Sequence, residues 1–196
     1  MAASVWRVWI GRGLAAVTAI GAAVALVGLT TGAWASGTFT GDSGDGTRHL
    51  VVNLYPDGRL TVRAGGDQGL RELYDAGQNV ALRSALEHAI PGTLDGFANV
   101  LVIALGLLAI AGIVKRLPTY LWAVGCAVAV GALTAVTVLR FEVLAALGTF
   151  MAQMHLTSST QVEDSALAGQ TTAALVVSLV AAAAAGSPLL RPAADD

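Results

Sequence analysis

The sequence predicts an all-α integral membrane protein, with four transmembrane helices and a small extracytoplasmic β-hairpin-plus-helix module between spans 1 and 2. Hydrophobic side chains make up 55% of the 196 residues and charged ones 12%, whereas a soluble domain carries about 25% charged residues. Four uncharged runs approach the roughly 20 residues that cross a bilayer as a helix. One segment between the first two runs alternates apolar and polar residues around a turn, which is typical of a β-hairpin.

The first apolar run predicts a transmembrane helix over residues 13–35, preceded by a cytoplasmic N-terminus of residues 1–12. The Ala-Trp-Ala sequence at its end, just before Ser36, resembles the cleavage site of a secretory signal. A signal peptide has an apolar core of about 7–15 residues, and this run is longer. The length favours a retained signal anchor, and cleavage remains the alternative.

The predicted extracytoplasmic module covers residues 36–95. Its first part is rich in Gly, Ser, Thr and Asp and predicts a flexible tether, because so little apolar surface forms no core. Apolar residues then alternate on both sides of the Pro-Asp-Gly sequence that starts at Pro56, which predicts a β-hairpin. Helical spacing follows from Asp67 to Pro91, and Gly77 leaves one bent helix or two short ones open.

The remaining apolar runs predict transmembrane helices at 96–114, 117–139 and 170–190, with a cytoplasmic tail at 191–196. Between the last two lies an extracytoplasmic segment, residues 140–169. Because this segment begins without Pro or Gly, the third helix either continues beyond the bilayer or bends at Arg140. The last helix can begin at Thr160 or Ser165, since both residue types cap helix N-termini.

The basic residues predict the orientation, because Lys and Arg near span ends concentrate on the cytoplasmic side. If all four runs cross, one side holds Arg7, Arg12, Lys115, Arg116 and Arg191. The other side holds six arginines and eleven carboxylates, a net charge of −5. Both termini are therefore expected to be cytoplasmic. A high ratio of Arg to Lys, with abundant Ala, Gly and Val, is typical of a high-GC bacterial genome, so the expected location is the bacterial cytoplasmic (inner) membrane.

Charge and cysteine content exclude several classes of function. The chain has 11 basic and 13 acidic residues, a formal net charge of −2, while nucleic-acid binding needs a basic surface. We therefore expect no nucleic acid as a partner. Cys126 is the single cysteine, so an internal disulfide, a CxxC redox centre and a thiolate-bound iron–sulfur cluster are excluded.

Other chemistry-bearing residues also show no recognisable pattern. His49, His88 and His155 stand in no metal-binding spacing, and no ionisable residue lies within the predicted spans, where proton or ion transport usually places one. We therefore predict no metal, no cofactor and no catalytic residue.

Two sets of residues are predicted to make contacts. Small residues at four-residue spacing let membrane helices approach closely, and they predict packing at Gly28, Gly32, Gly125 and Gly131. A module of about 45 ordered residues without a disulfide rarely folds alone, so its apolar and aromatic residues are expected to face a partner. These predicted partner contacts are Leu54, Tyr55, Leu73 and Tyr74.

These features favour a non-catalytic accessory or scaffold subunit of a larger bacterial membrane complex, in respiration, secretion or envelope transport. Its expected partners are other integral membrane proteins and the lipid bilayer. The alternative is an extracytoplasmic sensor or small transport component that binds a cation or a basic ligand on its acidic outer face. An enzyme acting on lipid or envelope precursors, with outer carboxylates as acid and base, is a third and weaker hypothesis.

Overall fold

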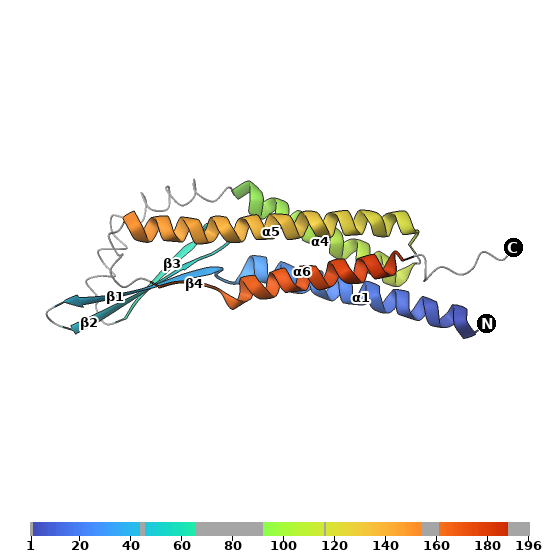
Figure 1. The fold of residues 1–196 in the computed structure, drawn as a ribbon, viewed down its shortest axis with the longest axis horizontal. Coiled ribbons are helices and arrows are strands. Elements are labelled where there is room, and N and C mark those ends of the chain that lie inside the picture. Colours follow the sequence, from blue (N-terminus) through green and yellow to red (C-terminus); the bar gives the residue numbers. More distant parts are fainter. Residues whose placement is uncertain (1, 44–45, 66–91, 116, 154–160, 188–196) are drawn as a thin grey trace. The chain divides into compact units, whose positions relative to one another are not determined.

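The computed structural model describes residues 2–43, 46–65, 92–115, 117–153 and 161–187, and Figure 1 shows its ribbon. In chain order the elements are α1 (Ala2–Thr31), β1 (Ala35–Ser43), β2 (Gly46–Leu54), β3 (Leu60–Gly65), α4 (Gly92–Val114), α5 (Thr119–Gln153), β4 (Gln161–Asp164) and α6 (Ala166–Ala185). The helix or helices predicted between Asp67 and Pro91 lie outside the described residues.

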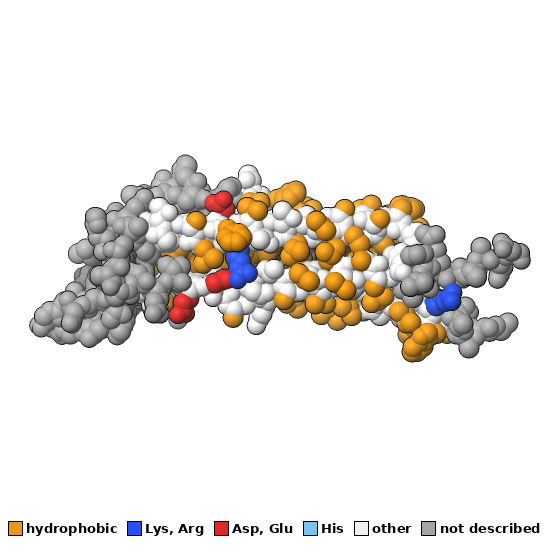
Figure 2. Space-filling view, viewed as in Figure 1, with side chains coloured by type: hydrophobic (Ala, Val, Ile, Leu, Met, Phe, Trp, Pro, Cys, Tyr) orange, Lys and Arg blue, Asp and Glu red, His pale blue; other side chains and the backbone are white. Residues whose placement is uncertain are grey.

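All four described helices are long and apolar enough to cross a membrane. The candidate spans are Val5–Thr31, Thr93–Val114, Thr119–Thr149 and Ala166–Ala185. Large apolar side chains also face outward along them, among them Ile20, Ile103, Leu107 and Val180. Figure 2 shows hydrophobic side chains over the helices on the visible face. In water such a surface would be costly, whereas lipid tails accommodate it.

The chain forms two compact units. The helical unit comprises Met1–Leu29, Gly96–Val136 and Gln170–Asp196, and the sheet unit comprises Thr30–Asp95 and Thr137–Gly169. Small side chains dominate the core of the helical unit: Ala15, Ala22, Ala25, Ala98, Ala109, Ala129, Ala132, Ala181 and Ala182 are all buried. Because lipid is as apolar as a helix surface, membrane helices associate through close backbone packing, which small residues permit.

In the sheet unit, four antiparallel strands form one sheet in the order β3-β2-β1-β4. The predicted hairpin is confirmed: β2 and β3 pair from Leu54 opposite Leu60 onward, and residues 55–59 make the turn between them. The Tyr55 N–H donates to the Arg59 carbonyl at 2.9 Å, and the Asp57 carboxylate accepts from the Arg59 N–H at 3.1 Å. Gly58 has φ +80°, a conformation that glycine adopts without strain.

The predicted flexible tether is wrong, because the segment rich in Gly, Ser, Thr and Asp forms strand β1. It pairs with β2 along its whole length, from Ala35 opposite Leu54 to Ser43 opposite Gly46. Its first four residues also pair with β4 on the other side. Two neighbouring strands satisfy the backbone of a central strand whatever its side chains are, so low apolar content did not exclude a strand here.

The helix bounds differ from the predicted spans at several ends. Helix α1 ends at Thr31 rather than at residue 35, because Trp34 joins the sheet: its N–H donates to the Leu54 carbonyl at 2.9 Å, and its carbonyl accepts from Ser165 N–H at 3.0 Å. Helix α5 runs unbroken past Arg140 to Gln153, which decides between the two alternatives for that segment. Helix α6 begins at Ala166 rather than at residue 170.

The start of α6 has a local cause. Ser165 precedes its first residue, and the Ser165 Oγ accepts a hydrogen bond from the Leu167 N–H at 3.2 Å. This is the geometry of an N-cap, which satisfies a backbone donor that the first turn leaves unpaired. Of the two residues predicted to begin the last helix, Ser165 is the one that does so.

Candidate functional site

The four predicted partner-contact residues fall in different environments. Leu54 is fully buried where β2 pairs with Ala35 of β1. Tyr55 is half-buried at the start of the hairpin turn, and the Arg59 guanidinium carbon lies 4.9 Å from the centre of its ring, a cation–π contact. Leu73 and Tyr74 lie outside the described residues. Their role in partner contact stays a prediction.

The four predicted packing glycines all lie against a neighbouring helix. A Cβ added at Gly28 would come within 3.2 Å of the Thr171 Cβ, and one at Gly131 within 3.3 Å of the Leu101 Cδ1. Gly32 faces the Leu167 side chain and Gly125 the Leu108 side chain, in both cases too closely for a further carbon. Real Cβ atoms rarely approach so near. At Gly32, Gly125 and Gly131 the nearest atom is the end of a leucine side chain, which can turn aside, whereas at Gly28 the added Cβ also meets the Thr171 Cβ.

Polar residues also lie at the contact between α1 and α6, and of these the sequence did not single out Thr18 and Thr171. Thr18, Thr171 and Ser178 are buried. The Ser178 hydroxyl lies 2.9 Å from the Ala174 carbonyl oxygen of its own helix and 3.3 Å from the Thr18 carbonyl oxygen of α1, so one proton is shared between two acceptors. Gly21 makes this approach possible, because its missing side chain leaves room for the Ser178 hydroxyl.

In the sheet unit, an ion pair joins α5 to strand β4. The Arg140 guanidinium binds the Asp164 carboxylate, and the two side chains are 33% and 30% exposed. Only the tertiary structure brings Arg140 and Asp164 together, since they are 24 residues apart. A pair this exposed contributes about 0–1 kcal/mol to stability.

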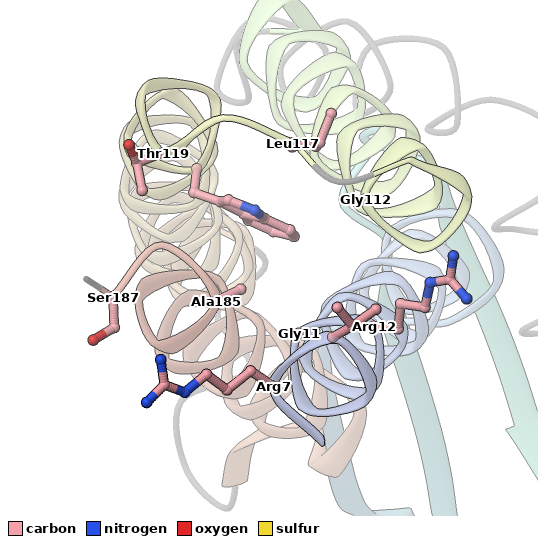
Figure 3. Close-up of a pocket in the computed structure, with 10 residues that line it drawn as sticks. Arg7, Gly11, Arg12, Gly112, Leu117, Thr119, Ala185 and Ser187 are labelled. Carbon is pink, nitrogen blue, oxygen red and sulfur yellow. The ribbon is translucent and has the colours of Figure 1, made fainter. Parts of the chain in front are cut away.

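A hollow lies at one end of the helical unit, where α4 and α6 end and α5 begins (Figure 3). It encloses about 630 Å³ including its open mouth. Its lining includes Arg7, Arg12, Leu117, Thr119, Trp122 and Ser187. We call it the arginine hollow.

Trp122 forms the apolar wall of the arginine hollow. It is 5% exposed and packs on Ala15 and Ala182. Two glycines make room for it: a Cβ on Gly112 would lie 2.7 Å from the Trp122 Cζ2, and one on Gly186 would lie 2.9 Å from the Trp122 Cβ. Any side chain at Gly112 would therefore collide with the indole ring.

The charges around the arginine hollow have one sign. The described residues of the helical unit carry three cations, Arg7, Arg12 and Lys115, and no carboxylate. In Figure 3, Arg7 extends from α1 toward the Ser187 side of the hollow, and Arg12 extends toward the α4 side. The sequence marked both arginines as signals of orientation only. What the sequence did not reveal is that they share a cavity with Trp122.

Four apolar helices of membrane-spanning length, with a small antiparallel sheet joined to them, define a multi-pass integral membrane protein. Its exposed apolar helix surfaces indicate contact with the lipid bilayer. Neither a model of a known protein family nor a curated protein sequence matches this chain.

Proposed function

We propose that this protein is a non-catalytic accessory or scaffold subunit of a larger bacterial membrane complex, with other integral membrane proteins as its partners. In this proposal it lies in the bacterial cytoplasmic membrane with both termini in the cytoplasm and the sheet outside. The observation that carries the proposal is the direct connection between the sheet and two membrane-spanning helices.

That connection is short on both sides. Only residues 32–34 separate α1 from β1, and Ser165 alone separates β4 from α6. The two strands pair with each other, from Ala35 opposite Asp164 to Thr38 opposite Gln161. Because no long linker intervenes, the chain passes directly from α1 into β1 and from β4 into α6. A partner bound to this sheet would be kept near the membrane by these short connections, which suits an accessory subunit.

The sheet also offers positions where a partner can bind. Within the described chain, the outer strands β3 and β4 each have a paired neighbour on one side only. The free backbone groups of an outer strand can pair with a strand of another protein. Beside β3, the hairpin turn presents Tyr55, and aromatic anchors commonly dominate the energetics of protein interfaces.

The test is co-purification of the natively expressed protein in mild detergent, with a C-terminal tag and mass spectrometry of every protein recovered. The proposal expects larger membrane proteins in fixed ratio to the bait. Tyr55→Ala should lower their recovery at least threefold, while the matched variant Tyr120→Ala, on an exposed side chain of α5 in the other unit, should leave it unchanged. Equal Tm values of the two variants will exclude unfolding as the cause.

Recovery of the protein alone, or as an assembly of its own copies, would overturn the proposal. The alternative function, a sensor or small transport component that binds a cation or a basic ligand, stays a prediction. It requires that such a ligand raise the free energy of unfolding of the purified protein by RT ln(1 + [L]/Kd), where [L] is the free ligand concentration.

A further inference from the structure

The arginine hollow combines two properties that a binding site for a charged amphiphile needs. Its rim carries the cationic side chains of Arg7 and Arg12, and its wall is the buried indole of Trp122 together with Leu117. The hollow is open to its surroundings at its mouth, so a charged group can enter it from outside. The question is which ligand the charges and the wall would select.

The charge balance selects an anion. The arginines can also interact with the unpaired carbonyls at the C-termini of α4 and α6. Each of these helix ends carries about −0.5 charge. The N-termini of α1 and α5 contribute about +0.5 each, so the four helix dipoles of this unit nearly cancel. The described residues that line the hollow include two arginines and no carboxylate, which favours an anionic ligand. Arginine is well suited to the anion expected here, because its planar donors match the oxygens of a phosphate.

The surroundings select a lipid over a free anion. The outer face of α1 beside Arg7 and Arg12 is apolar: Val5, Trp6 and Trp9 are 57%, 68% and 64% exposed. Tryptophan concentrates at the level of lipid headgroups, so this end of the helical unit is expected to lie at the membrane surface. There a headgroup phosphate can reach the arginines while its acyl chains remain on the apolar face of α1. Basic pockets between membrane helices bind anionic headgroups in this manner.

We propose that the arginine hollow binds the phosphate headgroup of an anionic phospholipid, with Arg7 and Arg12 at opposite sides of the headgroup and the acyl chains along α1. The site is separate from the partner surface of the sheet, so it holds whether or not the accessory-subunit proposal does. According to this proposal, this end of the helical unit binds anionic lipid selectively, in addition to its general contact with the bilayer.

The experiment uses the full chain in nanodiscs of phosphatidylcholine alone or with 30% phosphatidylglycerol, and counts phosphatidylglycerol molecules retained after detergent extraction by native mass spectrometry. Wild type should retain phosphatidylglycerol in preference to phosphatidylcholine. Arg12→Gln should weaken retention about fivefold, the effect of one cation near an anionic headgroup, and Arg7→Gln/Arg12→Gln should weaken it further. Lys115→Gln is the matched control, because it removes one charge at the same end but does not line the hollow.

Four results would overturn the proposal. Equal retention by wild type and the double variant would show that the arginines do not hold the lipid. An equal loss in Lys115→Gln would show general surface charge and no particular site. Displacement of phosphatidylglycerol by millimolar inorganic phosphate would assign the hollow to free anions. A fall in the Tm of the double variant in phosphatidylcholine nanodiscs, without loss of lipid selectivity, would assign the arginines to helix capping. The variant Arg12→Lys keeps the charge and should therefore retain most of the phosphatidylglycerol.

Discussion

Replacement of Gly21 by alanine tests whether close contact between α1 and α6 stabilises the helical unit. The added Cβ would lie 2.8 Å from the Ala174 carbonyl oxygen and 3.4 Å from the Ser178 Cβ, and it would also meet the Ser178 hydroxyl. A backbone carbonyl of a helix cannot turn aside as a side chain can. The two helices must therefore separate by several tenths of an ångström, and the 3.3 Å contact of the Ser178 hydroxyl with the Thr18 carbonyl is lost.

The expected magnitude follows from two opposing terms. Overpacking a close contact costs about 1–3 kcal/mol, while Gly→Ala inside a helix gains up to about 1 kcal/mol. The control Gly13→Ala lies on the same helix with no atom within 4 Å of its Cβ, so it shows the gain alone. We expect Gly21→Ala to be about 1–3 kcal/mol less stable than Gly13→Ala, which in a chain of this size is a Tm lower by about 2–12 °C.

The single cysteine provides the assay. Cys126 is partly buried on α5, and its reaction with a thiol-specific fluorescent dye during heating in detergent reports unfolding of the helical unit. Gly21→Ala/Ser178→Ala should recover part of the lost Tm, because it removes the hydroxyl but leaves the contact with the Ala174 carbonyl. Equal Tm values for Gly21→Ala and Gly13→Ala would refute the reasoning, and full recovery in the double variant would show that the carbonyl contact costs nothing.

Two further predictions concern the sheet unit. In a double-mutant cycle with Arg140→Gln and Asp164→Asn, the coupling energy measured from Tm should be below about 1 kcal/mol and should shrink at 1 M salt, because the pair is one-third exposed; a larger, salt-independent coupling would contradict this. For orientation, Thr61→Cys in a Cys126→Ala background places a thiol on an exposed position of β3, and a membrane-impermeant maleimide should label it in intact cells. Labelling only after the membrane is permeabilised would reverse the orientation.

The sequence alone determined the features that depend on neighbours along the chain. The span of α4 closes at Lys115 because a charge after a run of apolar residues ends it, and its length was predicted within a few residues. The β2–β3 hairpin was likewise predicted, because alternation and the Pro-Asp-Gly turn that contains Gly58 are both local signals. Four-residue spacing predicted packing at Gly28, Gly32, Gly125 and Gly131, but it did not predict which residues lie against them.

Only the tertiary structure decided what depends on distant partners. Strand β1 is a strand because β2 and β4 satisfy its backbone, and β4 comes from residues more than a hundred positions later. Arg140 meets Asp164, and Arg7 meets the cavity of Trp122, through the same long-range folding. Hydropathy and turn propensity are properties of a short window, whereas hydrogen-bond pairing and cavity formation are properties of segments that meet in space. A polar segment therefore carried no sign of the strand that it becomes.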